Sequence, residues 1–398
     1  MREKGFNMKK IVQLNVVCNG STGKIMCDIA KEAKKYNYKS YCFFGRGNGN
    51  ENLDCIKIAS SFSVYLHLLL ARLGFNGHGS YFATKKLVKR LKIIDPDVIH
   101  LHNIHGYYLN LKILFKYLKN DYKGQIVWTL HDCWAFTGHC AYFTMAKCSK
   151  WKKCCENCPQ LFTYPKQLFD TTKREYELKK KLFTGINNIT IVTPSIWLKD
   201  LVKLSFLNQY DVKVINNGVD LNIFKPTYDK NIYEKYGIPR DKKIILGVAN
   251  IWENRKGLND FLELNNVLDL SKYQIVLVGE NKEDVSKISK SILCIERTDN
   301  AVDLAKIYTI STALFNPTYE DNYPTVNLES ISCNTKVITY DTGGCKEQID
   351  KLNGGYIIKN KDYNSVIDIL DGISKNKKVI KSLPCGTCQM INEYIRLY

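Results

Sequence analysis

Two carboxylates in the second half of the chain have a spacing that suits sugar recognition. Asp321 and Glu329 bracket a loop and the start of a predicted helix in "EDNYPTVNLESIS". A carboxylate accepts two hydroxyl hydrogen bonds at once, so one of the pair could contact the reacting end of a ligand while the other binds hydroxyls further along. The ordinary alternative is a helix-end charge and a solvated glutamate.

Two cations precede this pair in the chain. Arg255 and Lys256 come just before Gly257 in "NRKG", at a predicted helix start. Paired cations beside helix-end amides suit a diphosphate. Because lysine and arginine are common on protein surfaces, an ordinary solvated pair is the alternative.

Glycine turns follow predicted strands in both halves of the chain. Gly20 and Gly23 lie in "NGSTGK" after the first strand, and Gly343 and Gly344 lie in "DTGG" after a late one. Glycine lets backbone amides approach an anion at a helix N-terminus. The first turn matches neither a dinucleotide fingerprint nor a Walker loop, so a plain tight turn is an equal alternative.

A histidine ends the strand that is predicted in "QIVWTLHDCWAFTGHC". His131 lies at the carboxyl end of this strand, where ligands bind in open parallel sheets. A hydrogen-bonded core histidine is the alternative, but the position favours a functional role.

A run of cysteines follows this histidine, with the spacing Cys140-x7-Cys148-x6-Cys155-x2-Cys158. A Cys-x2-Cys pair with two further cysteines nearby is adequate for a tetrahedral structural zinc. Cys154 could replace Cys155, and buried free thiols are the alternative. A zinc ion would close a segment that lacks a core of its own, beside the place where an acceptor must enter.

The composition indicates a folded, basic protein without a membrane span. The 398 residues are 45% hydrophobic, and Lys and Arg exceed Asp and Glu by 58 to 39, giving a net charge of +19. Such a surplus implies an anionic partner. The start of the chain has no apolar signal core, and the longest apolar stretch, 63–75, falls short of the roughly 20 residues that a bilayer span needs. We therefore expect a cytoplasmic protein.

A basic helix is predicted over residues 81–94, "YFATKKLVKRLKII". Its apolar residues form one stripe and its cations occupy the rest of the surface. Together with the apolar segment 63–75, it could contact the anionic inner face of the plasma membrane, where a lipid-diphosphate acceptor would lie. An ordinary solvated helix is the alternative.

Short β-branched runs alternate with helical stretches along the chain, which indicates parallel sheets covered on both faces. Two such series predict an α/β fold of two doubly wound domains, 1–217 and 218–383, that face a central cleft. The cysteine-rich insertion falls at about 133–160, and a C-terminal helix at 384–398 is expected to pack back on the first domain. The predicted strands are 9–15, 39–45, 97–102, 125–130, 189–195, 212–218, 243–249, 273–280, 291–296, 313–318, 336–341 and 355–359.

Together these segments resemble the retaining glycosyltransferases of group 1 (family 4), over nearly the whole chain. The most similar branch serves capsule, O-antigen and colanic-acid-type polysaccharide synthesis, in which "HD.WAFTG.C" and a following cysteine group recur. The resemblance implies a GT-B fold of two Rossmann-like domains, a nucleotide-sugar donor and a lipid-linked or saccharide acceptor. The residues that carry it are "NGSTGKI", "DVIHLHNIHGYYLNL", "TLHDCWAFTGHC", "VTPSIWL", "VINNGVD", "IFKP", "NRKG", "EDNYPTVNLE" and "TGGCKEQI".

The resemblance also implies catalytic roles. His131 would lie at the reacting sugar, and Lys256, helped by Arg255, would neutralise the leaving diphosphate. Glu329 would hold the ribose of the nucleotide. Asp321 stands where the family has its first glutamate, and its side chain is one methylene shorter.

The resemblance also implies roles for the glycines. Gly20 and Gly23 would lie near the donor diphosphate or the acceptor. Gly343 and Gly344 would bring backbone close to the sugar and the phosphate.

The expected reaction is hexose transfer with retention and without a catalytic metal. Cationic side chains would stabilise the charge that develops on the diphosphate, in the place of a metal ion. A UDP-sugar is favoured over a GDP-sugar. Two alternatives stay open: a nucleotide-sugar epimerase of the same fold, and a zinc-containing basic protein that binds nucleic acid. No basic recognition helix accompanies the cysteine run, so we expect no nucleic-acid partner.

Overall fold

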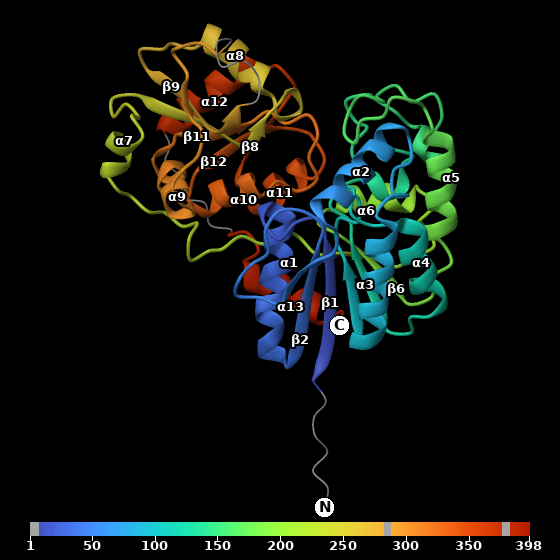
Figure 1. The fold of residues 1–398 in the computed structure, drawn as a ribbon. Coiled ribbons are helices and arrows are strands. Elements are labelled where there is room, and N and C mark those ends of the chain that lie inside the picture. The colour runs from blue at the N-terminus through green and yellow to red at the C-terminus, as the bar shows by residue number, and fades with distance from the viewer. Residues whose placement is uncertain (1–7, 282–287, 376–382) are drawn as a thin grey trace, which may run out of the picture. The chain divides into compact units, whose positions relative to one another are not determined.

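The computed structural model describes residues 8–281, 288–375 and 383–398. The chain divides into two compact units. Unit 1 comprises Met1–Ile215 together with Met390–Tyr398, and unit 2 comprises Asn216–Gln389. Each unit is an α/β layer structure with one parallel sheet (Figure 1).

Unit 1 contains a seven-stranded parallel sheet in the order β3-β2-β1-β4-β5-β6-β7. The predicted strands of the first half are all present. The prediction missed β3, which lies at the edge of the sheet and whose residues "CIK" include no buried side chain, so that no continuous apolar run marks it. The strands are β1 (Lys9–Asn15), β2 (Tyr38–Phe44), β3 (Cys55–Lys57), β4 (Val98–Leu101), β5 (Gln125–Thr129), β6 (Ile189–Thr193) and β7 (Val212–Val214).

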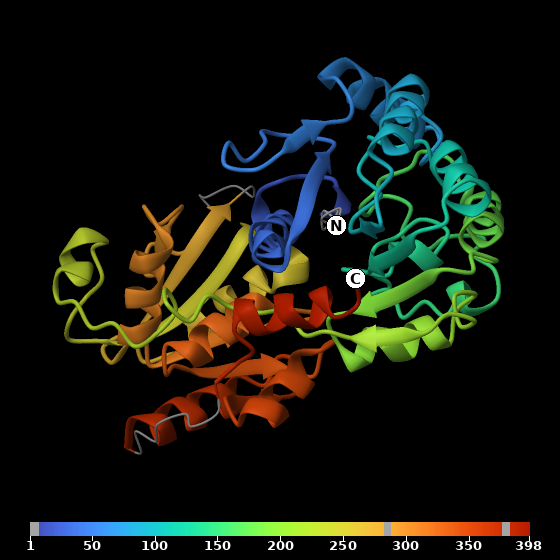
Figure 2. The same ribbon diagram turned by 90° about the horizontal axis from the view of Figure 1, so that it is seen from below.

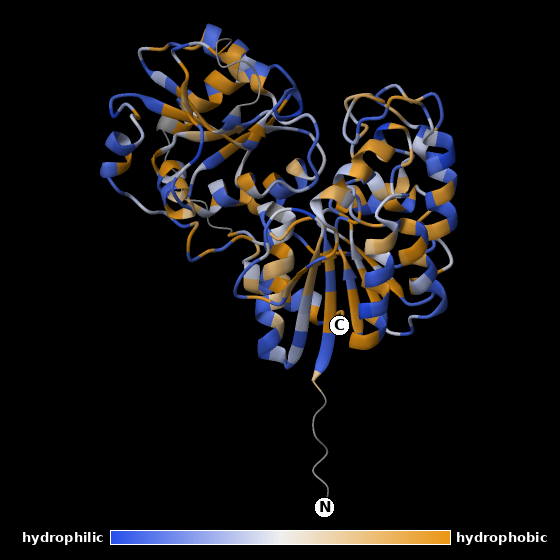
Figure 3. Ribbon diagram, viewed as in Figure 1, coloured by the Kyte–Doolittle hydropathy of each residue, from blue (hydrophilic) through white to orange (hydrophobic). Residues whose placement is uncertain are grey.

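The helices of unit 1 cover both faces of this sheet (Figure 1). On one face, Trp128 of β5 packs with Phe115 and Phe183, whose rings lie 5.8 and 5.0 Å from the Trp128 ring between centroids. Apolar residues therefore follow the strands and the inner sides of the helices (Figure 3). The helices are α1 (Gly20–Ala33), α2 (Ser61–Arg72), α3 (Tyr81–Ile94), α4 (Leu111–Asn120), α5 (Thr172–Phe183) and α6 (Ile196–Lys203).

The last helix, α13 (Thr387–Ile395), packs on the other face of the unit 1 sheet from Met390 onward. His100 of β4 contacts the hydroxyl of Tyr398 at 2.6 Å, and the Tyr394 hydroxyl hydrogen bonds to Thr129 at 3.2 Å. Figure 2 shows α13, in red, beside the strands of unit 1. The end of the chain therefore supplies polar partners to an otherwise buried strand surface.

Unit 2 contains a six-stranded parallel sheet in the order β10-β9-β8-β11-β12-β13. All six predicted strands of the second half are present, and the two parallel sheets confirm the predicted fold class. The strands are β8 (Lys243–Trp252), β9 (Tyr273–Asn281), β10 (Leu293–Ile295), β11 (Ala313–Asn316), β12 (Lys336–Tyr340) and β13 (Gly355–Ile358).

A buried cluster lies on each face of this sheet. One contains Leu246 and Leu314 with Ile307 and Leu328, and the other contains Ile245 and Phe315 with residues of two further helices. Burial on both faces explains the continuous apolar strands. The helices are α7 (Asn231–Lys235), α8 (Leu258–Val267), α9 (Ala301–Ile310), α10 (Thr325–Ser332), α11 (Cys345–Leu352) and α12 (Tyr363–Lys375).

Candidate active site

Three loops of unit 2 meet at the carboxyl edge of its sheet. They follow the adjacent strands β8, β11 and β12, and they contain Lys256, Asp321 and Gly343 respectively. The loops are in close contact, since the Gly344 amide donates to the Asn322 carbonyl at 2.8 Å. The sheet order thus places three separate predicted motifs side by side, as expected for the ligand edge of an open parallel sheet.

Lys256 and Asp321 form an ion pair within this edge. Lys256 Nζ lies 2.5 Å from Asp321 Oδ2, and the two side chains are 23% and 15% exposed. The backbone amide of Asn322 also donates to Asp321, at 2.9 Å. The aspartate is therefore fixed from two sides and holds the lysine ammonium at the loop surface.

Arg255 has a different set of contacts. Its guanidinium donates to the Glu320 carbonyl at 2.8 Å and to the Glu253 carboxylate at 2.7 Å. Its own carbonyl accepts from the Tyr319 amide at 2.9 Å. Arg255 thus joins the loop after β8 to the loop after β11, so a structural contribution accompanies any role in binding.

Glu329 lies in α10, behind the Asp321 loop. It is partly buried, and its carboxylate accepts a hydrogen bond from the Tyr308 hydroxyl at 3.1 Å. Tyr308 is fully buried in α9. The glutamate therefore has a rigid support on one side of its carboxylate.

In unit 1, the turn between β1 and α1 contains Gly20 and Gly23. Gly20 has a φ of +69°, and a Cβ on Gly23 would lie 2.5 Å from the carbonyl carbon of Cys18. The side-chain amide of Asn15 donates to the Val17 carbonyl at 2.9 Å and ties the turn to the end of β1. Glycine is thus required here by close packing as well as by any ligand.

His131 lies at the end of β5, beside a group of polar side chains. Its Nε2 is 3.2 Å from Nδ1 of His102, and the neighbouring Asp132 carboxylate is 3.0 Å from Nε2 of His105. These four side chains line one small pocket at the ends of β4 and β5. Burial lowers the pKa of His131 to about 4, so its imidazole is neutral near pH 7.

The sequence reasoning missed the partners of His131. None of the motifs in the sequence singled out His102, His105 or Asp132. β4 and β5 pair in parallel up to Leu101 and Trp128, so the segments that follow the two strands meet at the same edge of the sheet, and this pairing cannot be read from either motif alone.

Comparison with known proteins agrees with this arrangement. Residues 229–395 match the family model described as "Glycosyl transferases group 1". This match assigns residues 229–395 to the group 1 glycosyltransferases. This glycosyltransferase is 24% identical to the putative colanic acid biosynthesis glycosyl transferase WcaC of Escherichia coli K12, over 98% of this chain and 99% of that protein.

Solved structures share the fold of this glycosyltransferase. A glycosyltransferase from Rickettsia africae has a TM-score of 0.69 at 16% identity and is covered over 98% of its chain, against 99% of this one. Anabaena Alr3699/HepE, in complex with UDP and glucose, has a TM-score of 0.67 at 13% identity, with 98% of both chains covered. The GT-B fold is thereby shared over nearly the whole chain.

Replacing Gly343 by alanine should impair this glycosyltransferase strongly. Gly343 has a φ of +54°, and an added Cβ would lie against the Asp321 carbonyl oxygen, at a separation no real Cβ has. The loop after β11 must then move, and the Lys256–Asp321 pair moves with it. We expect Gly343→Ala to lower the melting temperature by several degrees and to abolish most donor binding.

The matched control is Gly372→Ala, in the exposed part of α12, where a Cβ would contact nothing within 4 Å. Alanine in a helix interior is favoured over glycine by about 1 kcal/mol, so this variant should be neutral or slightly more stable. Calorimetry and donor titration compare the two. Equal behaviour of both variants would show that the glycine turn is not required.

Acidification should destabilise unit 1 of this glycosyltransferase below pH 6.5. His67, His100, His102 and His139 are buried, and burial holds their pKa values low: about 4 for His67 and His139, and well below 6.5 for the other two. Since an unfolded histidine has a pKa of about 6.5, the unfolded state binds more protons as the pH falls from 6.5 toward 4. Each histidine then removes about 1.4 kcal/mol of the free energy of unfolding per pH unit.

Urea unfolding between pH 7 and pH 5 measures this slope. The variant His67→Asn lacks one of the five histidines with a lowered pKa, His131 included, so its slope should be smaller by one proton. An identical slope in wild type and variant would contradict the assignment of buried neutral histidines.

The cysteine-rich segment surrounds one cavity in unit 1. Cys140, Cys148, Cys155 and Cys158 all line it, together with His139. The Gly138 amide donates to the sulfur of Cys155 at 3.2 Å. Among the described residues, however, these four cysteines do not form a group with sulfurs within 4.8 Å of one another. The group that does so comprises Cys18, Cys27 and Cys55.

A buried lysine stabilises the turn that links His131 to this segment. Lys179 of α5 donates to the carbonyls of Trp134 and Thr137 at 2.8 and 3.0 Å. Its ammonium also lies 3.6 Å from the centroid of the Trp134 ring. No local pattern could have singled out Lys179, because its partners are backbone groups far away in the chain.

Within the described part of the chain, no helix has the length and apolar character needed to cross a bilayer. The segment 63–75 instead forms most of α2 and the turn after it.

Proposed function

We propose that this glycosyltransferase moves a hexose from a nucleotide diphosphate sugar to a lipid-linked or saccharide acceptor in cell-surface polysaccharide synthesis. The observation that carries the proposal is the edge of the unit 2 sheet, where the Lys256–Asp321 pair, the Gly343 turn and Glu329 lie in one unit. The name of the relative from E. coli, a putative colanic acid biosynthesis enzyme, supports the polysaccharide role.

The proposed donor contacts follow from the chemistry of these side chains. The Lys256 ammonium, assisted by Arg255, neutralises the diphosphate, and the turn at Gly343 and Gly344 brings backbone close to phosphate or sugar oxygens. Glu329 accepts the ribose hydroxyls. A UDP-sugar is the favoured donor, in agreement with the UDP and glucose bound to the Anabaena protein of the same fold.

The proposed reaction breaks the bond between the anomeric carbon and the diphosphate oxygen, and the electron pair stays on the diphosphate. An acceptor hydroxyl attacks the anomeric carbon on the face that the diphosphate leaves, and its proton passes to a diphosphate oxygen. Retention of configuration follows. Lys256 contributes most because its positive charge stabilises the negative charge that develops on the diphosphate in the transition state.

His131 is proposed to act at the reacting sugar as a neutral hydrogen-bonding group. Its lowered pKa keeps it uncharged near pH 7, and its contact with His102 fixes the ring orientation. The glycine turn at Gly20 and Gly23 is proposed to contribute backbone amides to the donor diphosphate or to the acceptor.

The test uses purified protein with UDP-hexoses or GDP-hexoses and an extract of lipid-linked saccharides. Release of nucleoside diphosphate should require the extract, and the anomeric proton of the product should show the configuration of the donor. Conversion of the donor sugar to its epimer without any extract would refute transfer in favour of epimerisation.

We also propose peripheral contact with an anionic membrane through α2 and α3. Hydrophobic side chains project from this region: Phe62 is 71% and Phe82 is 83% exposed. Figure 3 shows α2 as largely hydrophobic. Exposed Lys85, Lys86 and Lys89 on α3 supply positive charge beside it. A helix pair with exposed apolar and basic side chains suits the interface of an anionic bilayer.

Sedimentation with vesicles tests this contact. Binding should require anionic lipid, weaken with salt, and fall at least tenfold in Phe62→Glu/Phe82→Glu. Equal binding of wild type and variant, or no binding, would refute it.

Zinc is further proposed for the cavity lined by Cys140, Cys148, Cys155 and Cys158. Burial raises the pKa of Cys140 to about 12 and of Cys155 to about 11, so without a metal these thiols stay protonated. Zinc would displace those protons, and side-chain rotation would bring the sulfurs together.

A further inference from the structure

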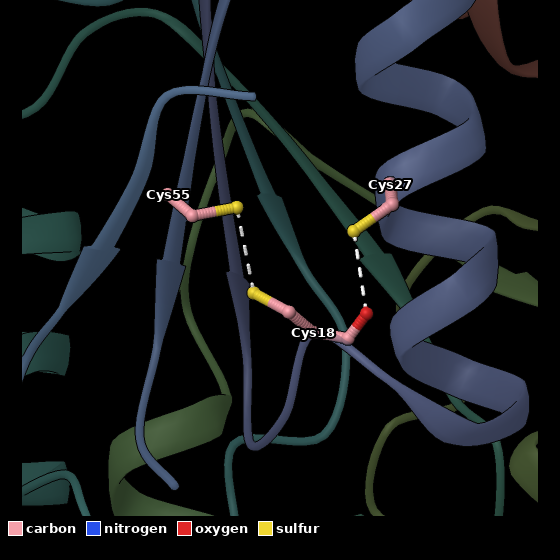
Figure 4. Close-up of side chains that lie close together, drawn as sticks. All are labelled: Cys18, Cys27 and Cys55. Carbon is pink, nitrogen blue, oxygen red and sulfur yellow. Dashed lines mark hydrogen bonds between the residues drawn. The ribbon is translucent and has the colours of Figure 1, made fainter. Parts of the chain in front are cut away.

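Four cysteines converge at the β2–β3 edge of the unit 1 sheet, which is not the segment with the Cys-x2-Cys spacing. Cys18 follows β1, Cys27 lies in α1, Cys42 lies in β2 and Cys55 begins β3. Cys42 and Cys55 are register partners in neighbouring strands. Figure 4 shows the sulfurs of Cys18, Cys27 and Cys55 pointing toward one another.

The distances between these sulfurs match those in a thiolate metal site. The sulfurs of Cys18 and Cys55 are 3.6 Å apart, and those of Cys18, Cys27 and Cys55 all lie within 4.8 Å of one another. Tetrahedral zinc with bonds to sulfur of about 2.3 Å places two sulfurs about 3.8 Å apart. The cluster therefore needs only small movements to coordinate an ion.

Cys42 is available as a fourth ligand. It is fully buried and is the register partner of Cys55, and its sulfur lies outside the group of three that are all within 4.8 Å of one another. The thiolate is the form that binds metals, and Cys55 is the half-buried member through which an ion could enter.

The surroundings favour a soft, dehydrated ion. Met26, Ala30 and Phe44 enclose the cysteines in a small apolar cluster. Buried free cysteines can act simply as small hydrophobic residues. Packing alone, however, does not require three sulfurs from a loop, a helix and a strand to face one another.

We propose that Cys18, Cys27, Cys42 and Cys55 bind a structural zinc ion that fixes the turn between β1 and α1. Cys18 precedes Asn19, the N-cap residue of α1. The Cys18 carbonyl accepts a hydrogen bond from the Cys27 thiol at 3.3 Å. The turn packs on Cys18, because a Cβ on Gly23 would lie 2.5 Å from the Cys18 carbonyl carbon. Zinc binding releases the remaining thiol protons to solvent and leaves four Zn–S bonds.

Metal analysis of the full chain tests the proposal and does not depend on transferase activity. The protein is prepared with zinc, dialysed and compared with two double variants, Cys18→Ser/Cys55→Ser and Cys148→Ser/Cys158→Ser. Cys18→Ser/Cys55→Ser should bind one zinc ion fewer per chain than the wild type, regardless of the zinc content of Cys148→Ser/Cys158→Ser. The matched control Cys294→Ser/Cys388→Ser, which replaces two exposed cysteines of unit 2, should keep all of it.

A second measurement uses the wild-type chain, in case the first variant does not fold. Alkylation of Cys55 is followed by peptide mass spectrometry in zinc and after chelation. We expect at least tenfold faster alkylation after chelation. Unchanged zinc in Cys18→Ser/Cys55→Ser, equal alkylation rates in both conditions, or a disulfide between these cysteines would each overturn the proposal.

Discussion

Lys256→Ala is expected to lower kcat by about 100- to 1,000-fold, because it removes the positive charge that is proposed to stabilise the leaving diphosphate. The free energy of unfolding should change little, since Lys256 is partly exposed and has one ion-pair partner in Asp321. Initial rates at saturating donor, together with calorimetry of the same samples, measure both quantities. The matched control is Lys272→Ala, an exposed lysine of unit 2 that pairs with Asp269.

A double variant distinguishes the loss of the lysine charge from the effect of leaving Asp321 unpaired. If Lys256→Ala acted only by leaving Asp321 unpaired, then Lys256→Ala/Asp321→Asn would regain activity. We expect it to remain as inactive as the single variant, because the diphosphate still lacks its cation. Full activity of Lys256→Ala would remove the lysine from the mechanism.

Glu329→Ala is expected to raise the KM for the donor by about 10- to 150-fold and to leave kcat nearly unchanged. The carboxylate is proposed to bind the ribose, which does not change charge during the reaction, so the ground state and the transition state lose the same interaction. A hydrogen bond to a charged group contributes about 1.5–3 kcal/mol, which sets this range. Steady-state kinetics with varied donor separates the two constants.

Tyr308→Phe is the matched control for this variant. It removes the buried hydroxyl that donates to Glu329 but keeps the carboxylate and the ring volume. We expect an increase in KM smaller than tenfold. A fall in kcat with an unchanged KM in Glu329→Ala would place this glutamate at the reacting centre and contradict a role in ribose binding.

The sequence predicted the strands of both sheets because both faces of each sheet are buried, which produces continuous apolar runs. β3 was missed because it lies at the edge of its sheet and has no buried residue. The residue types of the donor site were also predictable from local motifs. The Lys256–Asp321 pair was not, because it depends on β8 and β11 lying next to each other in the sheet.

The cysteines show more clearly that contacts between distant parts of the chain cannot be predicted from local patterns. The spacing in the chain singled out Cys140, Cys148, Cys155 and Cys158, which surround one cavity. The sulfurs that approach most closely, those of Cys18 and Cys55, have no motif spacing at all. Their contact arises from the parallel register of β2 and β3 and from the turn after β1, which local patterns do not encode.

Thermal stabilisation by nucleotides tests the central claim most directly, namely that unit 2 binds the diphosphate of a nucleotide sugar through Lys256. Wild type, Lys256→Ala and Lys272→Ala are melted with UDP, GDP, CMP and dTDP and with their sugars. A ligand at about 100 times its Kd stabilises the folded state by about 2.7 kcal/mol, a shift of several degrees. We predict this shift with UDP and UDP-sugars in wild type and in Lys272→Ala, and its loss in Lys256→Ala. No shift with any nucleotide, or an equal shift in all three proteins, would contradict the claim.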